Sequence, residues 1–154
     1  MIAGIDPGVA GAIVVNDNGT LAVLDMPTFE VPRGKGKRKV IDGLEVCHFL
    51  SIFASQLDLV IIEEVGSRPG NAGSAMFNFG YGAGLIHGVC VGLGLQVAHV
   101  RPQKWTKALG VGPDKNRHRD EAKLRFPGQA DLFNLVKHDG RADGALITVW
   151  AGGR

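Results

Sequence analysis

The first 26 residues of the chain carry apolar and polar positions in three short runs separated by turn residues. Runs of this length and composition are typical of strands. They predict strands over residues 1–6, 10–16 and 20–26. The sequence Asp17-Asn18-Gly19 favours a tight hairpin between the last two strands, because Asn and Gly accept positive φ.

The next segment, residues 27–40, has no periodicity. Pro27, Pro32 and a run of cations interrupt any regular pattern, which is typical of a loop. We therefore expect a basic flexible loop at about residues 28–41.

The rest of the chain alternates helical and strand patterns. Residues 43–57 have apolar side chains at helical spacing, and residues 58–65 are apolar nearly throughout, as a central parallel strand is. The remaining predicted elements are one strand, 95–100, and helices over 72–94, 102–109, 114–126 and 142–151. This order predicts one α/β domain over residues 1–154. Its mixed five-stranded sheet combines a three-stranded antiparallel meander with two parallel strands, flanked by helices.

Glycine recurs every fourth residue in the long helical segment, at Gly80, Gly84, Gly88 and Gly92. On a helix these glycines form one smooth face, where a second backbone can approach closely. Each glycine costs a helix about 1 kcal/mol relative to alanine, so the pattern calls for an explanation. Two remain open: tight packing on the sheet, or contact with another helix across a dimer.

Composition places the chain among α/β proteins of aqueous compartments. Of its 154 residues 45% are hydrophobic and 21% charged, and no apolar run approaches the roughly 20 residues that span a membrane. The first residues lack the basic start of a secretory signal. Cys47 and Cys90 have apolar neighbours, which favours reduced thiols in the core. We expect a cytoplasmic protein, in the bacterial host if a phage encodes it.

Cations are unevenly distributed, although the net charge is only +2. Residues 33–39 hold five cations and no acid, and residues 101–125 hold eight Lys or Arg against three Asp or Glu. Such clusters favour a polyanionic partner. A solvated surface explains an isolated charge run equally well.

Acidic residues lie at the ends of three predicted buried elements. Asp6 ends the first strand, and Glu63 and Glu64 end the second long apolar strand. If these strands are parallel neighbours, Asp6 meets one of the two glutamates at the same sheet edge. Asp139 and Asp143 share a helix face if the last helix begins by residue 139.

Oxygen ligands without a Cys or His pair suit Mg²⁺ or Mn²⁺, often as two ions about 4 Å apart around a phosphodiester. Each acid also has a structural explanation, as a turn residue, a surface charge or a helix cap. Asp143 is the hardest to explain in this way, because it interrupts an apolar run.

Three motifs together resemble the RuvC-type Holliday junction resolvases, most closely their phage and poxvirus branch. They are Ile-Asp-Pro-Gly at 5–8, Ile-Glu-Glu-Val at 62–65 and Asp-Gly-Arg-Ala-Asp at 139–143. The resemblance implies a ribonuclease H-like fold, a homodimer, and paired nicks across a four-way DNA junction that depend on two Mg²⁺ ions, with Mn²⁺ as a substitute.

Carried over by motif, the implied catalytic and metal ligands are Asp6, Glu63 and Asp143. Bacterial members have an acid or histidine three residues before the last aspartate, where this chain has Gly140. Asp139 is therefore our fourth ligand, with His138 as a weaker substitute.

The resemblance also bears on DNA and dimer contacts. The segment from residue 71 to Gly88 is similar to the family's dimer helix, which implies an interface at Gly80, Gly84, Gly88 and Phe77. The family uses lysines after its fifth strand, although the alignment slips there. Our expected DNA-binding residues are Arg33, Lys35, Lys37, Arg38, Lys39, Lys104, Lys107, Lys115 and Arg117. No aromatic wedge lies in residues 66–70, so junction opening falls to Phe77 or the basic loop.

Three alternatives remain. The acids fit equally well another nuclease of the same fold that cuts flaps, other branched DNA or RNA–DNA hybrids. An actin-like or sugar-kinase-like nucleotide binder needs two such domains, for which 154 residues are too few. A non-catalytic DNA-structure binding protein is disfavoured by the four ordered acids.

Overall fold

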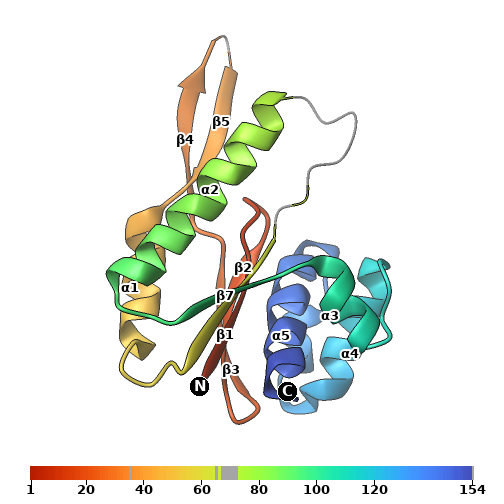
Figure 1. Ribbon diagram of the computed structural model, residues 1–154. Helices are drawn as coiled ribbons and strands as arrows, with labels where there is room; N and C mark the ends of the chain where they lie inside the picture. Colours follow the sequence, from red (N-terminus) through yellow and green to blue (C-terminus); the bar gives the residue numbers. More distant parts are fainter. Residues whose placement is uncertain (35, 65, 67–72, 154) are drawn as a thin grey trace.

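A five-stranded mixed sheet forms the centre of the protein (Figure 1). The computed structural model describes residues 1–34, 36–64, 66 and 73–153. The strand order is β3-β2-β1-β6-β7, with β1 and β2 antiparallel, β2 and β3 antiparallel, and β1, β6 and β7 parallel. The strands are β1 (Ile2–Asp6), β2 (Ala12–Asp17), β3 (Thr20–Asp25), β6 (Leu59–Glu63) and β7 (Val97–Val100). The predicted sheet is confirmed.

Helices cover both faces of this sheet (Figure 1). On one face α1 (Gly43–Phe53) and α2 (Gly73–Gly92) bury Leu50, Ile86 and Cys90 against the strands. On the other face α3 (Pro102–Ala108), α4 (Lys115–Arg125) and α5 (Asp139–Gly152) enclose a second apolar cluster. Because β1 and β6 are buried from both sides, they are apolar nearly throughout. Cys47 and Cys90 are free thiols.

The expected loop at residues 28–41 is a second, two-stranded sheet, so that prediction is wrong. Strands β4 (Thr28–Arg33) and β5 (Gly36–Ile41) form an antiparallel hairpin that projects beyond the main sheet (Figure 1). Phe29 pairs with Val40 and Thr28 with Ile41 across it, and Gly34 has a positive φ of 58° in the turn. Each strand has a free edge, which accommodates Pro32 without a break.

The last helix begins three residues earlier than predicted. Two short 3₁₀ helices, η1 (Pro127–Phe133) and η2 (Val136–His138), lead into α5, so Asp139 lies in its first turn and shares a face with Asp143. The predicted helix boundary at 142 is therefore wrong, while the condition for the shared face is met.

Helix α5 lies directly on β1 because both carry glycine where they meet. A Cβ atom on Gly144 would lie 2.9 Å from the carbonyl oxygen of Gly4 and 2.8 Å from Cγ2 of Val14. Neither backbone nor strand side chain has room to move, so larger residues are excluded here. This contact fixes the height of α5 over the sheet and thereby the position of Asp143.

The glycine face of α2 does not pack on the sheet. A Cβ atom at Gly80, Gly84, Gly88 or Gly92 would meet nothing within 4 Å. Gly82, which lies off this face, packs closely, because a Cβ there would lie 2.8 Å from Cδ1 of Ile41. Packing within the chain therefore does not explain the four-residue repeat. Among the described residues, no helix combines the length and hydrophobicity needed to cross a bilayer.

Candidate active site

Three carboxylates from separate parts of the chain converge at one end of the sheet. Asp6 and Glu63 are the last residues of β1 and β6, which run parallel in a register that pairs Ile5 with Ile62. Helix α5 brings Asp143 to the same place, where its charge raises the pKa of both Asp6 and Glu63. The convergence expected from the topology is thus present in the structure.

Asp143 is fully buried and is neutralised by two cations of α4. Its two carboxylate oxygens are held separately, one by the ammonium of Lys115 and the other by Nδ1 of His118 at 2.7 Å. The Nε2 atom of His118 lies 2.8 Å from the carbonyl oxygen of Gly112. Both ring nitrogens face acceptors, which favours the imidazolium form of His118, in which both nitrogens donate.

The pKa shifts of these cations agree with that geometry. Burial alone would lower the pKa of His118, but its hydrogen bond to Asp143 raises the value above the usual range. Burial would also lower the pKa of Lys115, and Asp143, followed by Asp6 and Glu63, outweighs it and raises the pKa. Lys115 therefore stays protonated and carries a positive charge among the three acids.

Asp6 and Glu63 hold protons more tightly than ordinary carboxyls. Burial raises the pKa of Asp6, and repulsion from Asp143 adds to the effect. Burial is the main cause that raises the pKa of Glu63, and the indole N–H of Trp105, which donates to Oε1 at 2.8 Å, lowers it; the net pKa is about 7. Repulsion from neighbouring acids contributes to the raised pKa of both Asp6 and Glu63. A positive charge bound beside them would therefore favour their ionised forms.

Asp139 lies near this group without joining it. Its carboxylate forms an ion pair with Arg119, which also donates to Asn116. Asp139 still raises the pKa of Asp6, although less than Asp143 does. The position three residues before Asp143 has no room for a side chain, because a Cβ on Gly140 would lie 2.5 Å from Cα of Gly11.

Two weaker candidates lie outside the site. Glu64 accepts from Arg101 at 3.0 Å on the surface, so Glu63 is the glutamate of the pair that faces Asp6. His138 is buried beside the backbone N–H of Leu135, which donates to its Nδ1 at 3.3 Å.

The donor set suits a hard divalent cation such as Mg²⁺, which prefers carboxylate oxygens. As the side chains stand, however, no three Asp, Glu, His or Cys residues in the described part of the chain form a ready set of metal ligands. Lys115 and His118 occupy both oxygens of Asp143. A cation that binds all three acids competes with Lys115 and His118 for Asp143, and the half-exposed Lys115 ammonium is the more easily displaced of the two.

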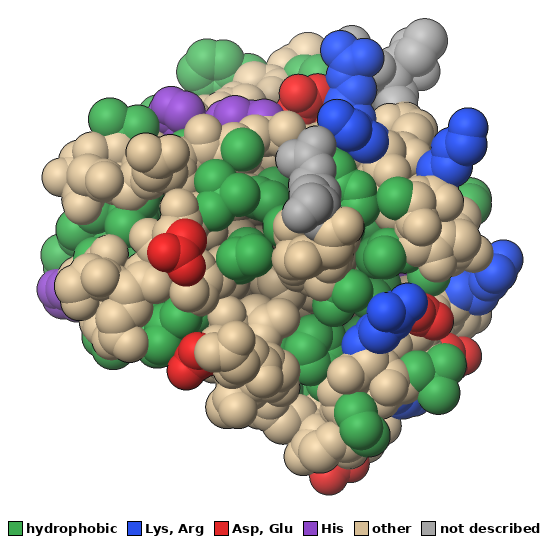
Figure 2. All heavy atoms as spheres, turned by 60° about the horizontal axis from the view of Figure 1, so that its bottom comes forward, with side chains coloured by type: hydrophobic (Ala, Val, Ile, Leu, Met, Phe, Trp, Pro, Cys, Tyr) green, Lys and Arg blue, Asp and Glu red, His purple; other side chains and the backbone are tan. Residues whose placement is uncertain are grey.

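The cations expected to bind DNA have different surroundings. Lys115 belongs to the acid group, and Lys37 pairs with Glu30 at 3.1 Å. Lys104 lies 5.8 Å from the ring centre of Trp150, and Arg117 donates to the carbonyl of Gly110. Arg33, Lys39 and Lys107 are exposed, Arg38 bonds Asn78, and Lys35 lies outside the described residues. On the face drawn in Figure 2, Lys and Arg gather on the side where Figure 1 places α3 and α4.

Sequence reasoning missed three residues of this site. Trp105, His118 and Arg119 each bind one of the acids. The spacing of Lys115, His118 and Arg119 offered a signal, because residues three and four apart share a helix face. The other cations of this basic segment hid that spacing.

The mixed sheet with helices on both faces is a ribonuclease H-like fold, and comparisons with solved structures agree. Thermus thermophilus RuvC superposes with a TM-score of 0.63 at 16% identity, covering 99% of this chain and 95% of that one. The same protein in complex with a Holliday junction substrate gives a TM-score of 0.67 at 15% identity, covering 99% and 94%. These likenesses confirm the fold.

A sequence relative carries the resemblance further. Over 85 residues, 54% of this chain, the sequence is 32% identical to the chloroplastic Holliday junction resolvase MOC1 of Chlamydomonas reinhardtii. The match spans only 10% of that relative's length. No protein-family model matches. The resemblance to RuvC-type resolvases is confirmed, while the nearness to the phage and poxvirus branch stays a prediction.

The raised pKa of Glu63 predicts a pH-dependent cost of folding. Because the folded protein binds this proton more tightly than the usual pKa of 4.5, ionisation destabilises the fold as pH rises from 4.5 through about 7. In EDTA, Glu63→Gln should therefore gain at least about 2 °C in Tm relative to wild type over that range. Thermal unfolding against pH measures it. Glu64→Gln is the control, and a Glu63→Gln gain that does not change with pH would contradict the assignment.

Proposed function

We propose that the protein is a metal-dependent endonuclease that resolves four-way DNA junctions by paired nicks. The observation that carries the proposal is the convergence of Asp6, Glu63 and Asp143 at one sheet edge of a RuvC-like fold. Buried acids that repel one another are costly, and a divalent cation offsets that cost. The sequence match to a Holliday junction resolvase favours a junction over a flap or an RNA–DNA hybrid.

Asp6, Glu63 and Asp143 would hold two Mg²⁺ ions, with Mn²⁺ as a substitute and Asp139 as a further ligand if Arg119 releases it. When bound, such ions supply an activated water and stabilise the leaving 3′ oxygen. The protein's own groups position the ligands. Trp105 fixes one oxygen of Glu63.

The cations of α4 divide the remaining work. His118 holds Asp143 through an imidazolium clamped between that carboxylate and Gly112. Lys115 neutralises the acids before metal binds and, once displaced, lies at the site with its charge free for a phosphate oxygen. A purely DNA-binding protein would have no use for three neighbouring acids, one fully buried and two partly buried, which disfavours the non-catalytic alternative.

The same proposal includes a homodimer built on α2. Its glycine face is open, and Phe77 and Tyr81 stack beside it with 69% and 58% of their surfaces exposed. The face adjoins a surface hollow of about 470 Å³ that also contains Glu63 and Glu64. Two-fold pairing there would place two acid groups on one assembly, as paired cuts require.

Asp6→Asn should reduce Mg²⁺-dependent cleavage of a synthetic four-way junction by more than about 100-fold. The variant keeps the shape of the site but loses a charged ligand, so junction binding measured in Ca²⁺ should remain. Flap, duplex and RNA–DNA hybrid substrates, run beside the junction, test its branch specificity. The matched control is Asp17→Asn at the far end of β2. Wild-type cleavage by Asp6→Asn would refute the metal site.

Neutralising the hairpin cations should weaken binding and flatten its salt dependence. Each lost phosphate contact lowers the slope of log K against log salt by roughly 0.9 on B-DNA. We expect Arg33→Gln and Lys39→Gln to show this loss, and Lys37→Gln to show less because Glu30 already neutralises it. Lys137→Gln on η2 is the control. Equal slopes for Lys39→Gln and wild type would remove the hairpin from the DNA interface.

Gly84→Leu should convert the dimer to a monomer without unfolding it. The new side chain meets open space in the isolated chain but keeps a second helix away. Light scattering measures the mass, and circular dichroism checks the fold. Gly128→Leu, also in open space, should leave the mass unchanged. A monomeric wild-type protein at micromolar concentration would overturn the dimer.

A further inference from the structure

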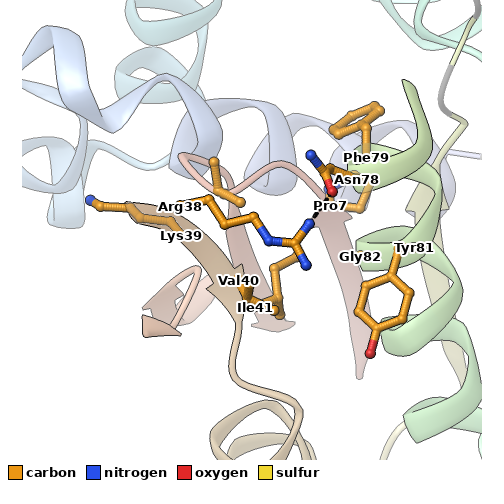
Figure 3. A pocket seen from close by; sticks show the side chains of 10 residues that line it. Pro7, Arg38, Lys39, Val40, Ile41, Asn78, Phe79, Tyr81 and Gly82 are labelled. Atoms are coloured by element: carbon orange, nitrogen blue, oxygen red, sulfur yellow. Dashed lines mark hydrogen bonds between the residues drawn. The ribbon is translucent and has the colours of Figure 1, made fainter. Parts of the chain in front are cut away.

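A pocket of about 240 Å³ opens between the hairpin and helix α2 (Figure 3). Val40 and Ile41 of β5 line it on one side and Phe79 of α2 on another, and Pro7, directly after Asp6, lines it as well. Gly82 lets helix and hairpin approach, since a Cβ there would lie 2.8 Å from Ile41. The walls are mostly apolar, with polar groups at one edge.

The polar edge consists of Arg38 and Asn78. The guanidinium of Arg38 reaches across the pocket and donates to Oδ1 of Asn78 (Figure 3). Because arginine is only a donor, this bond fixes which end of the amide faces it and leaves the Asn78 N–H₂ group for another partner. Both residues therefore offer hydrogen-bond donors, and a ligand must supply acceptors.

The pocket adjoins the candidate active site through the turn after β1. The backbone N–H of Gly8 donates to Oδ1 of Asp6 at 3.1 Å. A Cβ on Gly8 would lie 3.4 Å from that oxygen and 3.6 Å from Cε2 of Phe79. Asp6 and Phe79 thus flank the same residue, so a group in the pocket is a close neighbour of a phosphate held at the acids.

We propose that this pocket takes one unstacked base of the DNA substrate, from a nucleotide next to the cut. The inference rests on the proposed function. A base fits the chemistry: its flat faces pack on apolar and aromatic walls, and its edge meets the polar groups. Lys39 lines the pocket and is exposed to solvent. The sugar-phosphate backbone attached to the bound base would therefore lie near a positive charge. A branch point supplies such a base at low cost, because stacking is already broken there.

The donor edge also selects the base. Guanine presents two adjacent acceptors, O6 and N7, to a pair of donors, whereas adenine offers N7 beside an amino group. The amino group of adenine would face the N–H groups of Arg38 and Asn78, leaving donors unpaired. The pocket therefore favours guanine over adenine, and the position of guanine would determine where the strand is cut.

The test uses a four-way junction library with random bases around the branch point. Sequencing the nicked strands in Mg²⁺ should show guanine preferred over adenine by at least about fivefold at one nucleotide near the cut. Asn78→Asp keeps the contact to Arg38 but turns the free group into an acceptor. It should shift the preference at that nucleotide toward adenine or cytosine, which present amino groups. Asn18→Asp, with the same charge change in the β2–β3 turn, should keep the wild-type pattern.

A binding measurement in Ca²⁺ gives a second readout. An abasic site at the preferred nucleotide should weaken binding to the wild-type protein at least about fivefold relative to guanine. Cleavage with no base preference, or an Asn78→Asp pattern equal to that of Asn18→Asp, would overturn the pocket and leave the proposed function standing. If Arg38→Ala weakened binding equally for every base and for the abasic site, Arg38 would be a phosphate contact. That result would also overturn the base pocket. No cleavage of any library member would instead refute the proposed function.

Discussion

The close contact between β1 and α5 is the constraint on which the acid group depends. Gly4 and Gly144 let the helix rest on the strand backbone, and one residue before Gly144 the chain presents Asp143 toward the end of β1. A methyl group at either glycine would lift the helix and move that carboxylate away from Asp6. The contact between Gly4 and Gly144 therefore affects two things: how α5 packs in the apolar cluster on that face of the sheet, and where Asp143 lies relative to Asp6.

Electrostatic compensation follows from that placement. Burial next to Asp6 and Glu63 would make Asp143 very costly as an isolated anion, so α4 contributes an ammonium and an imidazolium to it. The two cations differ in how firmly they are held. His118 is buried and bonded at both nitrogens, whereas the Lys115 side chain is about half exposed and reaches Asp143 by its tip. Of the two partners of Asp143, Lys115 is the one that a divalent cation could displace.

Much of this arrangement was predictable from sequence, and the failures have identifiable causes. Strand order follows from hydrophobic runs and crossover rules, so the meeting of Asp6 and Glu63 could be inferred without coordinates. The hairpin was missed because three successive cations, Lys37 to Lys39, mask the pairing of Phe29 with Val40. Trp105 and His118 were missed because their roles arise from the packing of α3 and α4 on the rest of the fold, and helical spacing alone does not say which element that face meets.

The hairpin and α2 then account for features that the acids alone leave unexplained. One side of α2 closes the donor-edged pocket with β5, and its glycine face stays open. Rotation by about 100° per residue separates these two faces on one helix. A partner bound at the glycine face would hold α2 in place, and with it Asn78 and Phe79. In the proposed dimer, pairing of the subunits and positioning of the pocket would be coupled through α2, whereas the acid group is carried by β1, β6 and α5.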